Sequence, residues 1–379
     1  MMEVTMKRLA ARLAAILALS APVLALPCVA EPVPGLALLA DDPAQHRPLS
    51  LSIWHPATAG VAMQMGGNAV FAGIPAQRDA SVAGGPFPLV LLSHGGLRSA
   101  ADSGAWLGAL LAAQGFLAVE INAPPPETAQ AAVDEIWRRP RDISRALDLM
   151  LADPHWAAYV DPARISVVGF ALGGTAALTL AGADFDAVRY GRACAGPKPA
   201  GPDCAWLAAQ DVSLNTVDPA GLARMRRDRR LASAIAIAPE YLSAFQGKGD
   251  ADGAPVLILS LGQEAAPNGP HGPRAVIPDA QPFDAFALCT DAAPQILLAE
   301  GEDPALCGTG KAARARIHQQ ITEVIGGFLR GGQAAADAGY GCAPDGPIDP
   351  HLQDALPESV SAEPEPPKAP ARFRPDAAG

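Results

Sequence analysis

One short segment constrains the fold of this chain more than any other part of the sequence. It runs from Arg164 to Gly174 and reads Arg-Ile-Ser-Val-Val-Gly-Phe-Ala-Leu-Gly-Gly. Its glycine spacing matches the strand–turn–helix motif Gly-x-Ser-x-Gly, which holds a nucleophilic serine on a sharp turn. Glycines flank such a turn because side chains there would collide with the backbone. Here the residue midway between Gly169 and Gly173 is Ala171, and a methyl group cannot attack an acyl carbon. The motif therefore predicts the turn and excludes its usual nucleophile.

The pattern of apolar residues predicts a mostly parallel sheet with helices packed against it. Residues 86–93 form a continuous apolar run that ends in Ser-His-Gly-Gly, as strands buried on both faces do. Further strands are expected at 49–54, 115–121, 164–169, 231–238 and 255–261. Apolar residues at helical spacing predict helices at 106–114, from about Asp142 to 151, at 175–180 and at 317–328. Asp142 is expected near the start of its helix, where it suits the helix dipole. Alternation of strands and helices is typical of a doubly wound α/β sheet.

The N-terminus has the features of a secretory signal. Met6, Lys7 and Arg8 precede an apolar run over 9–26, and Cys-Val-Ala at 28–30 is an acceptable cleavage site. Cleavage after Ala30 predicts a secreted or periplasmic protein. Lipidation at Cys28 is an alternative, as is an uncleaved anchor. No other segment is apolar enough to predict a membrane span.

Cleavage of this signal, residues 1–30, leaves a long domain and a tail of different composition. The domain is expected over 31–335, with a polar and irregular insertion at about 184–230 that lies over the sheet. The tail over 336–379 is rich in proline, acidic residues and alanine. Such a composition buries too little apolar surface to order itself. The sequence therefore predicts one folded domain followed by a disordered tail.

Cysteine usage and charge narrow the classes of partner. Two pairs of modest separation predict disulfides, Cys194 with Cys204 and Cys289 with Cys307, which an exported protein keeps oxidised. Cys342 has no assigned partner. No histidine–cysteine cluster has the spacing of a zinc site, and no metal or cofactor is implied. The net charge of -11 argues against nucleic acid and anionic membranes as partners.

Several motifs together resemble a known family. They are Leu-Val-Leu-Leu-Ser-His-Gly at 89–95, Arg-Asp-Ile at 141–143, Asp-Pro-Ala-Arg-Ile at 161–165, the glycine turn, and Ala-Ile-Ala-Pro at 236–239. Jointly they resemble the predicted dienelactone hydrolases, exported α/β-hydrolases related to platelet-activating-factor acetylhydrolases. The resemblance runs from Arg47 to Phe328 and covers most of the mature chain. It implies an α/β-hydrolase fold and ester hydrolysis by a serine, a histidine and an acid.

The resemblance places these three roles on residues that leave the catalytic triad degenerate. The nucleophile position falls on Ala171. The acid is expected in the turn Gly-Gln-Glu-Ala, where Ala265 is the best match and the adjacent Glu264 is an alternative carboxylate. The histidine position falls on Pro282. Because triad members act as a unit, the loss of one leaves the others little to maintain.

The backbone of the turn is expected to survive these losses. The resemblance implies an oxyanion hole made by the amide of Leu172 and by one amide of the loop Gly95, Gly96 and Leu97. Ser93 and His94 are implied to be scaffold beside this loop. Donors at a helix N-terminus suit anions, so a small acyl or carboxylate ligand is the expected partner.

Other side chains are weaker candidates for chemistry. Thr175, one helical turn beyond Ala171, is expected to be a packed helix residue, and His271 a solvated loop residue. Two further histidines are expected at the surface, His155 and His318. Three functions remain open: an inactive homologue that binds a ligand or partner, an active carboxylic-ester hydrolase with an unrecognised nucleophile, and a folded relic without activity.

Overall fold

The structure is a computed structural model. It describes residues 33–58, 60–96, 100–195, 203–246, 252–262, 272–301, 303–308 and 310–331. The predicted signal, the predicted tail and Cys342 lie outside these residues. No helix in these ranges is long and apolar enough to cross a membrane. Within the same ranges, no three histidine, cysteine or acidic side chains are grouped to hold a metal ion.

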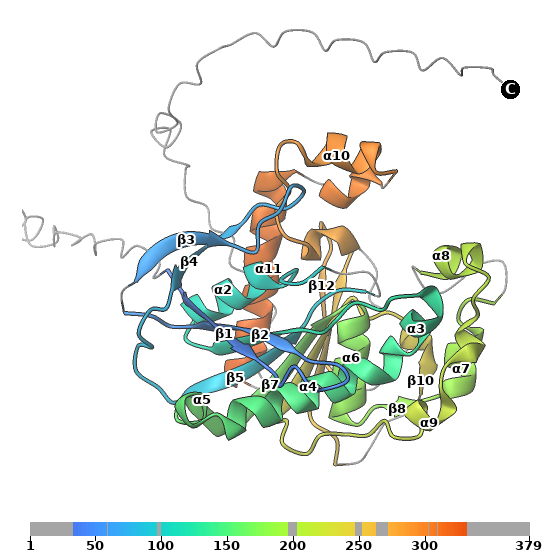
Figure 1. Cartoon of the computed structure of the whole chain (residues 1–379), viewed down its shortest axis with the longest axis horizontal. Coiled ribbons are helices and arrows are strands. Elements are labelled where there is room, and N and C mark those ends of the chain that lie inside the picture. The colour runs from blue at the N-terminus through green and yellow to red at the C-terminus, as the bar shows by residue number, and fades with distance from the viewer. Residues whose placement is uncertain are drawn as a thin grey trace, which may run out of the picture. The chain divides into compact units, whose positions relative to one another are not determined.

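A 10-stranded sheet forms the centre of the described part of the chain (Figure 1). Its order is β12-β11-β9-β7-β5-β6-β2-β1-β4-β3. From β6 to β12 neighbouring strands are parallel, whereas β2 is antiparallel to both β6 and β1. The strands are β1 (Gly35–Ala40), β2 (Ser50–His55), β3 (Val61–Met65), β4 (Ile74–Arg78), β5 (Phe87–Ser93), β6 (Leu117–Asn122), β7 (Val160–Phe170), β9 (Ser233–Ile237), β11 (Val256–Leu261) and β12 (Arg274–Ile277). The mostly parallel sheet expected from the sequence is confirmed.

Helices cover both faces of the sheet and make two separate cores (Figure 1). Helices α2 (Ala105–Ala113) and α11 (Lys311–Gly331) pack on one face, and α4 (Glu135–Ala152) and α6 (Leu172–Ala181) on the other. Strand β5 supplies both cores, because Val90 and Leu92 point towards α2 and α11 while Leu89 and Leu91 point towards α4 and α6. Burial of both faces explains why this strand is a continuous apolar run.

Helix α4 begins earlier than the sequence indicated. It begins at Glu135 and contains Pro140, so the expected start near Asp142 is wrong. The arginines and the proline before Asp142 interrupt the apolar periodicity and conceal the first two turns. Asp142 lies inside the helix, where it accepts a hydrogen bond from Arg47 Nε at 2.8 Å. An ion pair with Arg47, rather than the helix dipole, balances its charge.

The segment between α6 and β9 is more regular than expected. It contains β8, α7, α8 and α9, and the Cys194–Cys204 disulfide joins α8 to the residues after α7. Tyr190 and Leu207 pack in one apolar cluster with Leu172, the first residue of α6. The short elements here and elsewhere are α3 (Ala129–Val133), α5 (Pro154–Ala157), β8 (Asp184–Phe185), α7 (Ala187–Arg192), α8 (Cys204–Ala209), α9 (Pro219–Leu222), β10 (Phe245–Gln246) and α10 (Ala293–Ala299). The expected insertion therefore contains several short helices and a two-residue strand that the sequence did not predict.

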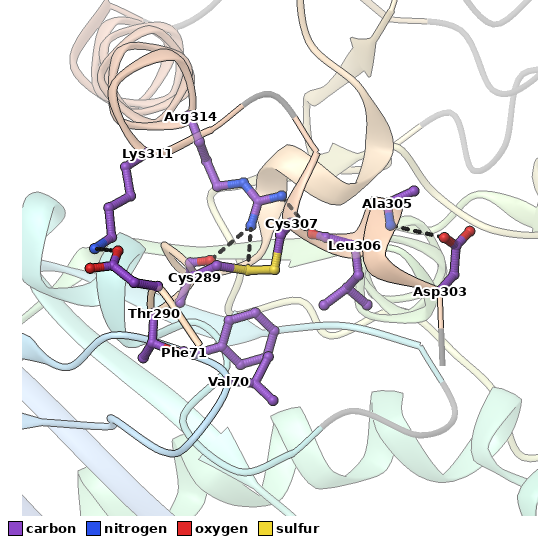
Figure 2. Close-up of a disulfide and its surroundings, with 12 residues drawn as sticks. Val70, Phe71, Cys289, Thr290, Asp303, Ala305, Leu306, Cys307, Lys311 and Arg314 are labelled. Atoms are coloured by element: carbon purple, nitrogen blue, oxygen red, sulfur yellow. Dashed lines mark hydrogen bonds and ion pairs between the residues drawn. A yellow bond between two sulfur atoms is a disulfide. The ribbon is translucent and has the colours of Figure 1, made fainter. Parts of the chain in front are cut away.

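The second predicted disulfide, Cys289–Cys307, is also confirmed (Figure 2). It lies beside Arg314 of α11, whose guanidinium points towards the sulfur atoms in Figure 2. On its other side, Thr290 N donates to Val70 O at 2.8 Å. The disulfide thus sits where α11, the segment after β12 and the loop after β3 meet.

Candidate ligand site at the turn after strand β7

Ala171 occupies a sharp turn between β7 and α6. Its backbone has φ 56° and ψ −120°, a left-handed conformation that is strained for a residue with a side chain. Neighbouring strands hold it, because Ala171 N donates to Ile237 O at 3.0 Å and Glu240 N donates to Ala171 O at 3.2 Å. Its relative exposure is 7%. The turn expected from the glycine spacing is therefore present, with a methyl group at its tip.

Close backbone contacts explain why glycines flank this turn. A Cβ on Gly169 would lie 2.0 Å from Gly173 O, and a Cβ on Gly173 would lie 1.8 Å from Ser93 O. No side chain fits at these separations. Gly174 is less constrained, since its nearest neighbours would lie at 3.2 Å. The spacing of the motif thus reflects contact between α6 and the ends of β5 and β7.

Arg139 fixes the loop after β5, in which Gly95 and Gly96 were expected to help form the oxyanion hole. Its guanidinium donates to Gly95 O at 2.6 Å and to Gly96 O at 2.5 Å. In a trans peptide the carbonyl and the next amide point in opposite directions, so the Gly96 N–H points away from Arg139. Leu172 is the first residue of α6, where backbone N–H groups have no partner within the helix. Leu97 lies outside the described residues.

Glu240 is a carboxyl group at this site that the sequence interpretation missed. It follows β9, and its Oε1 would lie 3.0 Å from a Cβ on Gly96. Its Oε2 is shielded from solvent and has no hydrogen-bond partner in the described part of the chain. Burial, assisted by the nearby charge of Asp203, raises the pKa of Glu240 to about 8. Glu240 therefore holds a proton at neutral pH and can donate a hydrogen bond.

The backbone of Glu240 is tied to the turn. Thr175 Oγ1 donates to Glu240 O at 2.5 Å, and Thr175 is fully buried. Thr175 is thus a packed helix residue, as expected. The sequence placed Glu240 directly after Ala-Ile-Ala-Pro at 236–239, the end of a predicted strand. Because β9 is the neighbour of β7 and the two strands are parallel, residues that follow them lie at the same edge of the sheet, and this position could have indicated Glu240 as a site residue.

The remaining triad positions are less informative. Pro282 is exposed and begins a 3-10 helix, Pro282–Ala285. Glu264, Ala265 and His271 lie outside the described residues. Of the three expected triad positions, the structure describes Ala171 at the turn and Pro282 at the start of its 3-10 helix.

Two histidines, one half-buried and one buried, hold the segment that carries Pro282. His94 Nε2 donates to Ala285 O at 2.8 Å. His318 was expected at the surface, and this expectation is wrong, because its relative exposure is 4% and its ring stacks on Trp106 at 3.7 Å. Its Nε2 lies 2.9 Å from both Asp284 O and Phe286 O. Both rings therefore serve as neutral donors to backbone carbonyls.

Burial of His318 predicts a loss of stability in acid. Burial lowers the pKa of His318 from 6.5 to about 4, while the unfolded chain binds the proton near pH 6.5. The contribution is therefore complete above pH 6.5 and is lost as pH falls towards 4, by about 3 kcal/mol in total. Urea unfolding at pH 7 and pH 4 is expected to show a smaller acid loss in His318→Gln than in the wild type. The exposed His155→Gln serves as control, and an equal acid loss in all three proteins would refute this role of His318.

Comparison with known proteins adds one structural likeness. No family model and no curated protein sequence matches the chain. Among solved structures, the chain is similar to a ferulic acid esterase from Streptomyces cinnamoneus, with 19% sequence identity and a TM-score of 0.48. The match covers 80% of this chain and 91% of that chain. The strand order and the turn at Ala171 are themselves consistent with an α/β-hydrolase-like fold.

Proposed function

We propose that this protein is an exported α/β-hydrolase homologue, related to dienelactone hydrolases, that binds a small acyl or carboxylate ligand and has lost ester hydrolysis. The observation that carries the proposal is Ala171, which holds the strained turn of a nucleophile without a nucleophilic atom. Strain of this kind costs about 1–3 kcal/mol and persists where the surroundings over-determine it. The alternative is an active carboxylic-ester hydrolase with an unrecognised nucleophile.

Three hydrogen-bond donors near the turn favour a ligand with oxygen acceptors. They are the N–H of Leu172 at the start of α6, the N–H of Gly96, and the protonated carboxyl group of Glu240. An ester carbonyl or a carboxylate offers matching lone pairs. Glu240 makes ligand binding depend on pH, because a deprotonated Glu240 would repel a carboxylate.

The Thr175 hydroxyl and one nitrogen of each of two nearby histidines are already engaged in hydrogen bonds, which favours the loss of hydrolysis. Thr175 Oγ1 donates to Glu240 O, so this hydroxyl stabilises the backbone after β9. His94 and His318 direct Nε2 to carbonyls of residues 284–286. A base must lie within hydrogen-bond reach of the nucleophile that it activates.

Binding of butyrate by the purified protein tests this proposal. We expect calorimetric binding at pH 7 that weakens above pH 8, where Glu240 loses its proton. Glu240→Gln keeps a donor without the titration, so it is expected to bind butyrate without this decline. Glu240→Leu removes the donor and is expected to weaken binding roughly tenfold, the effect of one hydrogen bond. The exposed Glu127→Gln is the matched control and should behave as the wild type.

Two outcomes would contradict the proposal. Absence of butyrate binding would refute the proposed ligand site. Binding with the same pH dependence in Glu240→Gln as in the wild type would refute the role of Glu240 in it. The wild type should also leave p-nitrophenyl butyrate unhydrolysed and resist a fluorophosphonate probe. Labelling at a mapped serine would favour the active hydrolase instead.

A further inference from the structure

A groove of about 720 Å³ on the outer face of α4 is rich in arginine. One wall is the helix, and the other is the segment 224–230, which reads Arg-Met-Arg-Arg-Asp-Arg-Arg. Seven arginines and two aspartates line it: Arg141, Arg145, Arg224, Arg226, Arg227, Arg229, Arg230, Asp148 and Asp228. The net charge of the whole chain is -11. Such a concentration of positive charge is therefore local and opposite in sign to the rest of the protein.

Arg230 fastens the two walls of the groove to each other. It pairs with Asp148 of α4 at 2.5 Å and with Asp228 of its own segment at 2.6 Å. Ser144 Oγ of α4 donates to Asp228 at 2.9 Å. The backbone is fixed as well, since Asp228 N donates to Leu180 O at 3.0 Å. The arginine-bearing segment is thus held in place against α4 before any ligand arrives.

Both aspartates of the groove are occupied by Arg230, and two further groove arginines, Arg145 and Arg224, pair with acidic residues outside it. Within the described residues, no ion pair is formed by Arg141, Arg226, Arg227 or Arg229. Arg227 Nε is shielded from solvent and has no hydrogen-bond partner there. A buried N–H without a partner costs free energy, and like charges that face one another repel. An anion in the groove would relieve both.

Trp137 helps to position the guanidinium groups at one end of the groove. Arg141 and Arg224 lie on opposite walls, and each guanidinium carbon is 5.8 Å from the centre of the Trp137 ring. Cation–π contact of this kind restrains the arginine side chains. A restrained guanidinium loses less entropy when it binds a ligand.

We propose that this groove binds a small soluble molecule that carries two or more phosphate or carboxylate groups. Unpaired guanidinium groups on both walls call for at least two anionic groups, each of which an arginine fork binds in bidentate fashion. The volume is within the range of small-molecule sites. The negative charge of the rest of the protein disfavours a long polyanion or an anionic membrane. Ala171, Gly96 and Glu240 do not line the groove, so this site is separate from the one proposed at the turn.

Calorimetric titration at low salt with pyrophosphate and with citrate tests this inference. At least one of them is expected to bind to one site per chain, about tenfold tighter or more than acetate and monophosphate. Binding should weaken when the salt concentration rises to about 0.15 M, because exposed charges are then screened. Replacing Arg226 and Arg229 together by glutamine should weaken binding about tenfold or more. Both side chains are exposed, so the variant is expected to fold, which circular dichroism would verify.

Two controls separate this site from general charge effects. Arg316→Gln removes an exposed arginine of α11 and should leave binding unchanged. Glu240→Gln should also leave it unchanged, so failure of the butyrate proposal does not affect this test. The inference is overturned if neither probe binds, if Arg316→Gln weakens binding as much as the groove variant, or if only phosphatidylglycerol vesicles bind.

Discussion

The Gly173→Ala variant is expected to lose roughly 4 kcal/mol or more of unfolding free energy, although it adds one methyl group. The new Cβ would lie 1.8 Å from Ser93 O. Ser93 ends β5, so the obstacle is backbone of a central strand and cannot rotate away. Either α6 or the end of β5 has to move, which disrupts both apolar cores. Urea unfolding followed by circular dichroism measures the loss.

The adjacent glycine provides the matched control. A Cβ on Gly174 would lie 3.2 Å from Gly169 O and from Pro239 Cα, so a shift of a few tenths of an ångström accommodates it. Both glycines belong to α6, and the gain in helix propensity from alanine is therefore the same in the two variants. Gly174→Ala is expected to lose about 1 kcal/mol. Equal losses in the two variants would mean that contact with Ser93 is not the cause.

Much of the fold was predictable from sequence because the features that specify it lie within single segments. The turn at Ala171 depends on residues within a single segment, and glycine spacing records it directly. The apolar run of β5 is also a local record, since burial on both faces demands apolar residues at every position. Strands β3 and β12 escaped prediction because they are short and largely exposed or half-buried at the edges of the sheet. Their pairing partners, not their composition, make them strands.

Sequence predicted only those residues of the candidate site that lie next to Ala171 in the chain or in a recognised motif. Leu172 follows from its place after Ala171, but Glu240 depends on three separate segments. Its neighbour Gly96 lies in the loop after β5, and its neighbour Asp203 directly precedes α8. Burial at that junction raises its pKa, and no pattern in the sequence records such burial. His318 escaped for the same reason, because its partner Trp106 belongs to a distant helix.

The Arg314→Met variant is expected to lose about 3–5 kcal/mol of unfolding free energy. Arg314 is 1% exposed, and its guanidinium donates to Asp284 Oδ1 at 3.3 Å, to Ala287 O at 3.0 Å and to Leu306 O at 2.6 Å. These bonds join α11 to residues near both ends of the segment closed by the Cys289–Cys307 disulfide. Figure 2 shows Arg314 and Leu306 beside this disulfide. Methionine fills similar space but donates nothing, so the carbonyls of Ala287 and Leu306 lose this donor and the buried Asp284 carboxylate loses one of its donors. Urea unfolding at pH 7 measures the effect.

A control and a second substitution assign the cause of that loss. Arg316→Met, on the exposed side of the same helix, is expected to change stability by less than about 0.5 kcal/mol. Asp284→Asn removes the buried negative charge, so adding it to Arg314→Met should recover part of the lost stability. The coupling between the two positions is then the measure of the ion pair, because each single variant leaves the other charge buried. Additive losses without recovery would show instead that packing and the two carbonyl bonds account for the effect, and that the Asp284 charge is balanced by other groups.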